Sequence, residues 1–278
     1  MKRFMLAYIE RPSPVQNLSG AIKLIVFLLW SVLSMLSYDP RILLALCLTG
    51  IVLFAVSKIR LREVSFIFKM LLLFMGFNLI GIYVFAPEQG VLIYESRHVL
   101  VQGLGRYTIT AEQLFYEMNV LLKYLSIVPP AILLMVTTNP SEFAASLNRI
   151  GVSYTVAYAV SLTLRYIPDV QRDFTHINRA QQARGLELSK KTSPLKRLKG
   201  AARLLLPLII SSMERIEVVS HAMELRGFGK NRTRSWYMAR PFNRFDLLVC
   251  GTALLLFALG IWFSFRSGSR FYSPWAGG

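Results

Sequence analysis

Apolar positions along this chain gather into five long runs, each followed by a shorter polar stretch or a more mixed segment. The runs cover residues 18–37, 41–57, 64–86, 112–138 and 244–264. About 20 apolar residues in a helix cross a hydrocarbon core roughly 30 Å thick. The pattern therefore predicts an all-α, polytopic membrane protein with about five transmembrane helices.

Residues 139–243, between the fourth and fifth runs, alternate apolar and polar positions with a helical period. Helix start and stop signals predict a short helix and two long ones, over 142–150, 152–184 and 194–226. Pro168 and Pro207 lie inside the long helices, where each removes a backbone hydrogen bond and is expected to mark a bend. The predicted domains are an N-terminal membrane domain, a segment of long amphipathic helices, and a C-terminal transmembrane helix with its tail: 1–138, 139–243 and 244–278.

The two long helices end in the same way. The first closes on Ala183, Arg184 and Gly185, and the second on Leu225, Arg226 and Gly227. Counting back from each arginine in steps of 3, 4 and 3 draws one stripe down a helix face. The two stripes are Phe174, Ile177, Gln181 and Ile216, Val219, Met223. Glycine suits the left-handed position just past a helix end, so each arginine is expected to project from a blunt end.

A basic residue followed by glycine is also an ordinary helix ending. The cation faces the negative end of the helix dipole, which contributes about 0.3–1 kcal/mol. For either arginine alone, that would be the better explanation. The shared stripe, the alanine four residues before each arginine and the shared glycine instead favour two helix ends that dock on two similar sites.

Composition and charge place the helices in a membrane. The chain is 54% hydrophobic, yet its formal charge is +17 at pH 7. Basic residues concentrate at the N-terminus, in the loop 58–62 and across 139–243, and they are sparse in 87–111. The positive-inside rule then makes the N-terminus and 139–243 cytoplasmic and 87–111 external. Charge segregated in this way indicates a lipid bilayer, and no nucleic-acid partner is expected.

The sequence offers no convergent set of residues for catalysis, a metal ion or a cofactor. It has no Gly-x-x-x-x-Gly-Lys-Ser/Thr loop, so ATP hydrolysis by this chain itself is not expected. The histidines are scattered, and Cys47 and Cys250 fall in apolar runs, where they are expected to pack as small apolar side chains. Glu112, Glu117 and Lys123 lie in the fourth run, where an ionisable residue is a functional-site candidate; for the glutamates, near its outer end, we expect snorkelling to the interface instead.

Several blocks of the chain resemble the transmembrane T component of energy-coupling factor (ECF) transporters. The resemblance is most specific over 137–227, and Leu225 stands where that family usually has alanine. The blocks are Asp39-Pro40-Arg41, Thr137 to Phe143, Leu164 to Pro168, Ala183-Arg184-Gly185 and Leu225-Arg226-Gly227.

This resemblance implies a multi-pass scaffold in the bacterial cell membrane. It implies two ABC-type ATPase subunits as partners, with Arg184 and Arg226 each placed in a groove of one ATPase. It also implies a small substrate-binding membrane subunit, the S component, for uptake of a vitamin or a metal ion. Two alternatives are a conventional ABC importer permease that lines its own substrate path, and a membrane-embedded enzyme. The paired arginine-ended helices argue against the first, and the lack of convergent acid, base or metal-ligand side chains argues against the second.

The predicted topology can be tested by thiol labelling of intact cells. Single cysteines replace Ser189 and Ser96 in a background that lacks Cys47 and Cys250. An impermeant reagent should label only the cysteine at 96, because charge segregation places that loop outside. Labelling at 189 in intact cells would overturn the orientation.

Overall fold

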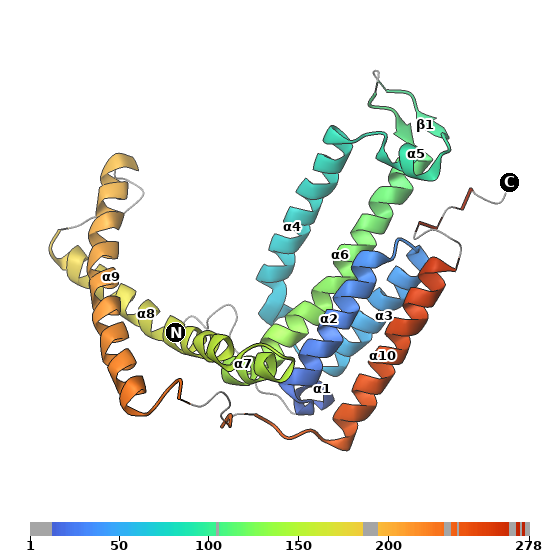
Figure 1. Ribbon diagram of the computed structural model, residues 1–278. Coiled ribbons are helices and arrows are strands. Elements are labelled where there is room, and N and C mark those ends of the chain that lie inside the picture. The colour runs from blue at the N-terminus through green and yellow to red at the C-terminus, as the bar shows by residue number, and fades with distance from the viewer. Residues whose placement is uncertain are drawn as a thin grey trace. The chain divides into compact units, whose positions relative to one another are not determined.

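The computed structural model describes residues 13–103, 106–185, 194–230, 235–237, 239–266, 271–272 and 274–275. The basic N-terminal residues and Ser189 lie outside this part of the chain. The protein is mostly helical, which confirms the predicted all-α, polytopic class (Figure 1). Its elements are α1 (Pro14–Asn17), α2 (Gly20–Leu36), α3 (Pro40–Val56), α4 (Leu61–Phe85), α5 (Gln89–Tyr94), β1 (Val99–Val101), β2 (Ile109–Thr110), α6 (Ala111–Thr137), α7 (Pro140–Arg149), α8 (Tyr154–Ala183), α9 (Pro194–Leu225) and α10 (Arg244–Phe265).

Each of the five apolar runs forms a helix: α2, α3, α4, α6 and α10. Three of these, α4, α6 and α10, are long and apolar enough to cross a membrane. Helices α2 and α3 are shorter, with 17 residues each, which is the low end of the length that spans a bilayer. The short α1 and α5 and the antiparallel β1–β2 ribbon were not predicted.

The chain folds into two compact units. The first contains residues 1–139 and 240–278, and the second contains 140–239. In the first unit α10 packs beside α2, so the C-terminal helix joins the N-terminal ones (Figure 1).

Helix α6 is the centre of the first unit, because α2, α3, α4 and α5 all contact it. Its Ile132, Leu133 and Val136 are buried against Ile59 and Val64, which lie at the α3–α4 connection and at the start of α4. These apolar contacts join α3, α4 and α6 at the end where α6 finishes.

A buried carboxylate organises the other end of α6. Glu112 has no exposed surface, and its carboxylate accepts hydrogen bonds from the backbone N–H of His98 at 3.0 Å and from Ser96 Oγ at 3.2 Å. Its Oε1 lies 2.6 Å from His98 Nδ1. The expectation that Glu112 snorkels to the interface is therefore wrong, because the preceding loop folds over this side chain and supplies donors to it.

The other ionisable side chains of α6 are also held by neighbours. Glu117 is half-buried and accepts a hydrogen bond from Gln113 Nε2 at 3.0 Å. Lys123 donates to the carbonyl oxygen of Met35 at 2.9 Å, and its ammonium lies 3.1 Å from the centre of the Tyr38 ring. The Lys123 contacts bind α6 to the end of α2 and to the residues after it.

Aromatic residues near the C-terminus return to the same end of the first unit. The ring of Phe271 lies 4.5 Å from that of Tyr38, and Trp275 lies 5.7 Å from Tyr94. Burial raises the pKa of Tyr94 to about 12. Trp275 also lies 6.0 Å from the ring of His98, so it packs on the loop that holds Glu112.

A polar cluster gathers the two points where the chain leaves and re-enters the first unit. The buried Lys23 donates from Nζ to the carbonyl oxygens of Thr137 at 2.9 Å and Gln16 at 3.4 Å. Arg240 donates to the same Gln16 oxygen at 2.9 Å. Thr137 precedes the second unit and Arg240 follows it, so the α1–α2 region holds both connections.

The contact of α5 with α6 leaves no room for a side chain at Gly90. A Cβ there would lie 2.4 Å from the carbonyl oxygen of Glu112 and 2.6 Å from the α-carbon of Gln113. We predict that Gly90→Ala lowers the free energy of unfolding by about 1–3 kcal/mol, because backbone must move. Thermal unfolding in detergent would measure it. Gly81→Ala is the matched control, since a Cβ at Gly81 meets nothing within 4 Å; equal melting temperatures for both variants would contradict the close approach.

Candidate docking site: two arginine-ended helices

Both long helices of the second unit stop directly after their arginines. In α9 the N–H of Gly227 donates to the Glu224 carbonyl at 2.8 Å, and the N–H of Phe228 donates to the Met223 carbonyl at 2.9 Å. This pair of bonds, with a φ of +65° at Gly227, is the Schellman ending. The predicted left-handed glycine after Arg226 is thereby confirmed.

The end of α8 follows the same plan. Gly185 has a φ of +83°, and its N–H donates to the Gln182 carbonyl at 3.0 Å. Arg184 occupies the capping position, and its own N–H still reaches the Ala180 carbonyl at 3.3 Å. A positive φ departs from right-handed helical geometry, and glycine adopts it readily because it has no Cβ. The helix therefore stops at the arginine that precedes Gly185.

Both arginines are exposed, as are the residues that precede them. Ala183 is exposed before Arg184, and Leu225 before Arg226 is 90% exposed. The two ends thus offer the same cation beside side chains of different size.

The two stripes lie in different surroundings. Ile216, Val219 and Met223 of α9 line a groove between α8 and α9. Phe174 is 40% exposed, Ile177 and Gln181 are half-buried, and none of the three lines this groove. The repeated spacing therefore does not place the two stripes in equivalent contacts within this chain.

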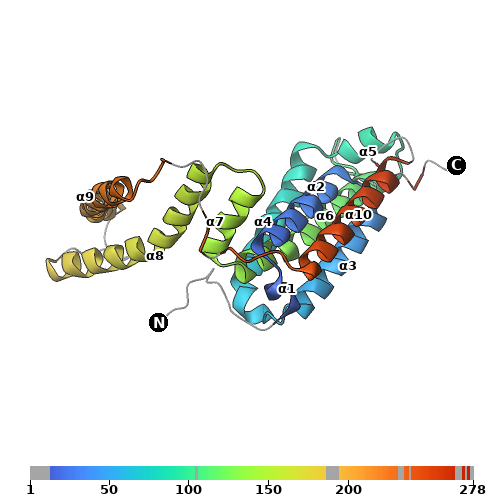
Figure 2. The same ribbon diagram turned by 60° about the horizontal axis from the view of Figure 1, so that its bottom comes forward.

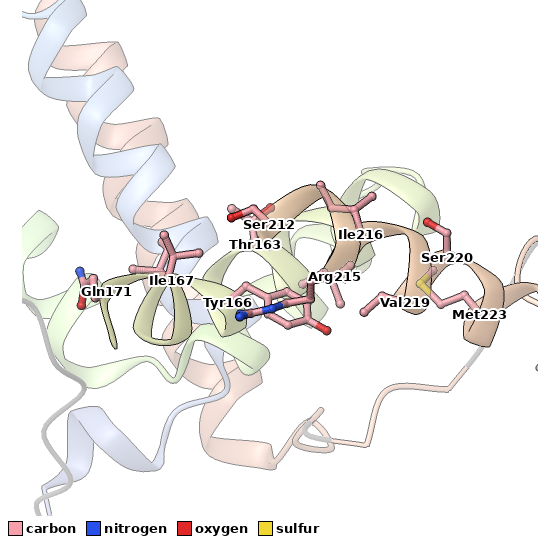
Figure 3. Close-up of a pocket in the computed structure, with 12 residues that line it drawn as sticks. Thr163, Tyr166, Ile167, Gln171, Ser212, Arg215, Ile216, Val219, Ser220 and Met223 are labelled. Carbon is pink, nitrogen blue, oxygen red and sulfur yellow. The ribbon is translucent and has the colours of Figure 1, made fainter. Parts of the chain in front are cut away.

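The groove encloses about 560 Å³ and is mostly apolar (Figure 3). Helix α8 contributes residues between Leu162 and Gln171, and α9 contributes residues between Ser212 and Met223. The half of α8 that precedes Gln171 thus lies along the half of α9 that follows Ser212.

Two contacts between α8 and the chain from α9 onward were not predicted. Arg215 forms an ion pair with Asp173, and its guanidinium lies 6.0 Å from the centre of the Tyr166 ring. In the sequence, each of these charges resembles an ordinary helix-surface residue. The signal that could have found the pair is the repeat itself, because Asp173 and Arg215 are separated by the same interval as the two arginine ends.

The second contact is an aromatic cluster near the end of α9. Phe228 lies 4.7 Å from Tyr158, and Trp236 lies 5.4 Å from Tyr154, measured between ring centres (Figure 2 shows α7, α8 and α9 from another side). Trp236 Nε1 also donates to Asn148 Oδ1 at 3.1 Å. Phe228 and Trp236, which follow Arg226, are therefore packed on the start of α8 and on α7.

The remaining candidate residues are the two prolines inside the long helices and the two cysteines. Helices α8 and α9 continue as single helices through Pro168 and Pro207, and a bend at either stays a prediction. Cys47 and Cys250 are half-buried and unpaired with each other. Within the described ranges, no group of three or more His, Cys, Asp or Glu side chains could hold a metal ion.

The sequence matches a known family and several curated relatives. The family model described as cobalt transport protein, CbiQ, matches residues 12–236. Three curated relatives carry the name energy-coupling factor transporter transmembrane protein EcfT. The protein from Streptococcus equi is 28% identical over 253 residues, covering 84% of this chain and 92% of the relative. The Lactococcus lactis protein is 27% identical over 264 residues (92% and 96%), and the Bacillus subtilis protein is 26% identical over 262 residues (91% and 94%).

The fold and the matches together define a polytopic membrane subunit of a transporter. The chain belongs to the CbiQ family, the transmembrane components of ECF transporters. It is the membrane-spanning component of such a transporter and not its ATPase. The predicted resemblance and the predicted membrane location are confirmed.

The helix ending at Gly227 yields a graded prediction. Gly227→Ala should weaken the last turn of α9 by about 1–2 kcal/mol, because a left-handed backbone places Cβ against a carbonyl oxygen. Gly227→Asn should weaken it less, since asparagine tolerates that conformation. Amide hydrogen exchange in the turn that ends at Leu225 measures the effect. Equal exchange in both variants would show that the left-handed ending does not limit the helix.

Proposed function

We propose that this chain couples two ABC-type ATPase subunits to a small substrate-binding membrane S component, for uptake of a vitamin or a metal ion. Arg184 and Arg226 are the proposed docking groups, one for each ATPase. The observation that carries the proposal is the matched pair of helix ends, each with an exposed arginine capping the helix and a left-handed glycine after it.

The chemistry of the ends suits a carboxylate-bearing groove. An arginine guanidinium offers a planar fork of donors that can bind a carboxylate through two hydrogen bonds. A groove removes water from this contact, so loss of one partner leaves the other charge buried and unpaired. Removal of one member of such a pair costs about 3–5 kcal/mol. Two such contacts would hold an ATPase pair while it closes and opens.

The remaining surfaces of the second unit suit the transmission of motion from the ATPases towards the membrane. Apolar side chains of the stripes, such as Phe174 and Ile216, are partly exposed and can bury when an ATPase or the S component binds. With 139–243 on the cytoplasmic side, as charge segregation favours, ATP-driven closure would move the helix ends. The long α8 and α9, with Pro168 and Pro207 as proposed bends, would carry that motion towards the membrane.

The test is retention of ATPase subunits by purified variants of the full chain, co-expressed with its partner subunits. Arg184→Ala and Arg226→Ala should each reduce the ATPase retained, and the double variant should retain none and transport nothing. Lysine at either position should restore little, because an ammonium lacks the planar fork.

Arg179→Ala is the matched control, since Arg179 is also exposed on α8 but is not its last residue. It should retain the ATPases as the unmodified chain does. A double Arg184→Ala, Arg226→Ala variant with normal complex size on gel filtration and undiminished transport would rule out the docking role.

A further inference from the structure

One contact between α8 and α9 joins equivalent positions of the sequence repeat. Arg184 lies 11 residues after Asp173, and Arg226 lies 11 residues after Arg215 (184 − 173 = 226 − 215). Asp173 and Arg215 are thus equivalent positions of the two copies, and they form an ion pair with each other. Helices α8 and α9 therefore contact each other at equivalent positions of the repeat.

From this contact the two arginine ends lie at equal distances along their helices. Eleven residues of α-helix span about 16 Å. The groove places the part of α8 before the pair along the part of α9 after it. The end of α8 therefore continues beyond the pair on the other side, and the two arginines lie on opposite sides of the crossing. Figure 1 shows α8 and α9 crossing in this unit.

The two charges at this contact have opposite signs. Where two copies of a repeat meet at equivalent positions, identical residues would face each other, and two like charges would repel. Here one copy has aspartate and the other arginine, so the contact is attractive. Both side chains are about one-third exposed, and Arg215 also lies over the face of Tyr166 (Figure 3). The planar guanidinium can satisfy both neighbours.

We propose that Asp173 and Arg215 form the pivot of the two coupling helices, and that they position Arg184 and Arg226 at a set separation. They are positioning residues, because they act through the helix ends and do not touch the partners. This proposal rests on the docking role of the two arginines. It adds that this charge pair helps to set the separation of the ends before any ATPase binds.

The separation can be measured on the full chain in lipid nanodiscs without partners. Ala180 and Ala222 are exposed, equivalent in the two copies, and each lies four residues before an arginine end. Cysteines at both positions, with Cys47 and Cys250 replaced by serine, can carry spin labels. Double electron–electron resonance then reports the distribution of distances between the two helix ends.

The variants exchange the charges. Asp173→Arg or Arg215→Asp alone should broaden and shift the distribution, because two like charges then face each other. The double exchange, Asp173→Arg with Arg215→Asp, should restore the original narrow distribution. The neutral Arg215→Gln gives a milder broadening and covers the case in which a single reversal fails to fold.

Arg172→Asp is the matched control. Arg172 pairs with Asp169 at 3.5 Å within α8 and is 73% exposed, so its reversal should leave the distances unchanged. Unchanged distances after either single reversal, or a double exchange that does not restore them, would overturn the pivot.

ATPase retention in the same variants separates this proposal from the docking role. If the distances respond as expected while Arg184→Ala, Arg226→Ala still retains the ATPases, the pivot stands and the docking role fails. If retention depends on the arginines while the distances ignore the charge exchange, docking stands and the pivot fails.

Discussion

The position at which each long helix stops is the constraint on which the proposed site depends. A helix that continued by one turn would carry its last side chain about 5 Å further along the axis. Gly185 and Gly227 prevent this, because each takes a positive φ that a residue with a Cβ disfavours. The exposed arginine is therefore set by the residue after it. An arginine within an uninterrupted helix would have the same charge but no end from which to project.

In the first unit, buried charged side chains are held by hydrogen bonds to neighbouring segments. Backbone and charged groups that sit in or near a bilayer need partners within the protein. Glu112 meets this need with donors from the loop before α6, and Lys23 meets it with carbonyl oxygens of α1 and α6. In both cases the buried charged side chain binds a loop or the end of a helix, and not the middle of a helix. The helices around α6 are joined by apolar packing and by hydrogen bonds such as that between Ser34 and Ser126, and the connections are held by hydrogen bonds as well.

The sequence predicted the elements whose signals are local. The five apolar runs, the short helix before Gly151 and the two ends at Gly185 and Gly227 follow from hydropathy, helical period and glycine. The fate of Glu112 could not be predicted this way, since its donors come from a loop that folds back over it. The ribbon β1–β2 pairs only three residues with two, too few to give a strand pattern. The aromatic contacts of Trp236 and Trp275 likewise join segments far apart in the chain.

The ion pair between Asp173 and Arg215 could be predicted only in part from the sequence. Each residue alone looks like a solvated charge on a helix, and nothing local distinguishes it from Arg172. Only the interval shared with the arginine ends makes the two positions equivalent, and only the structure shows that they touch. The end of α9 has a further contact that the repeat does not predict, because Phe228 packs on Tyr158 near the start of α8. A repeat can thus supply two arms of equal length on either side of one attractive contact. Equal length on either side of the crossing suits two similar docking sites.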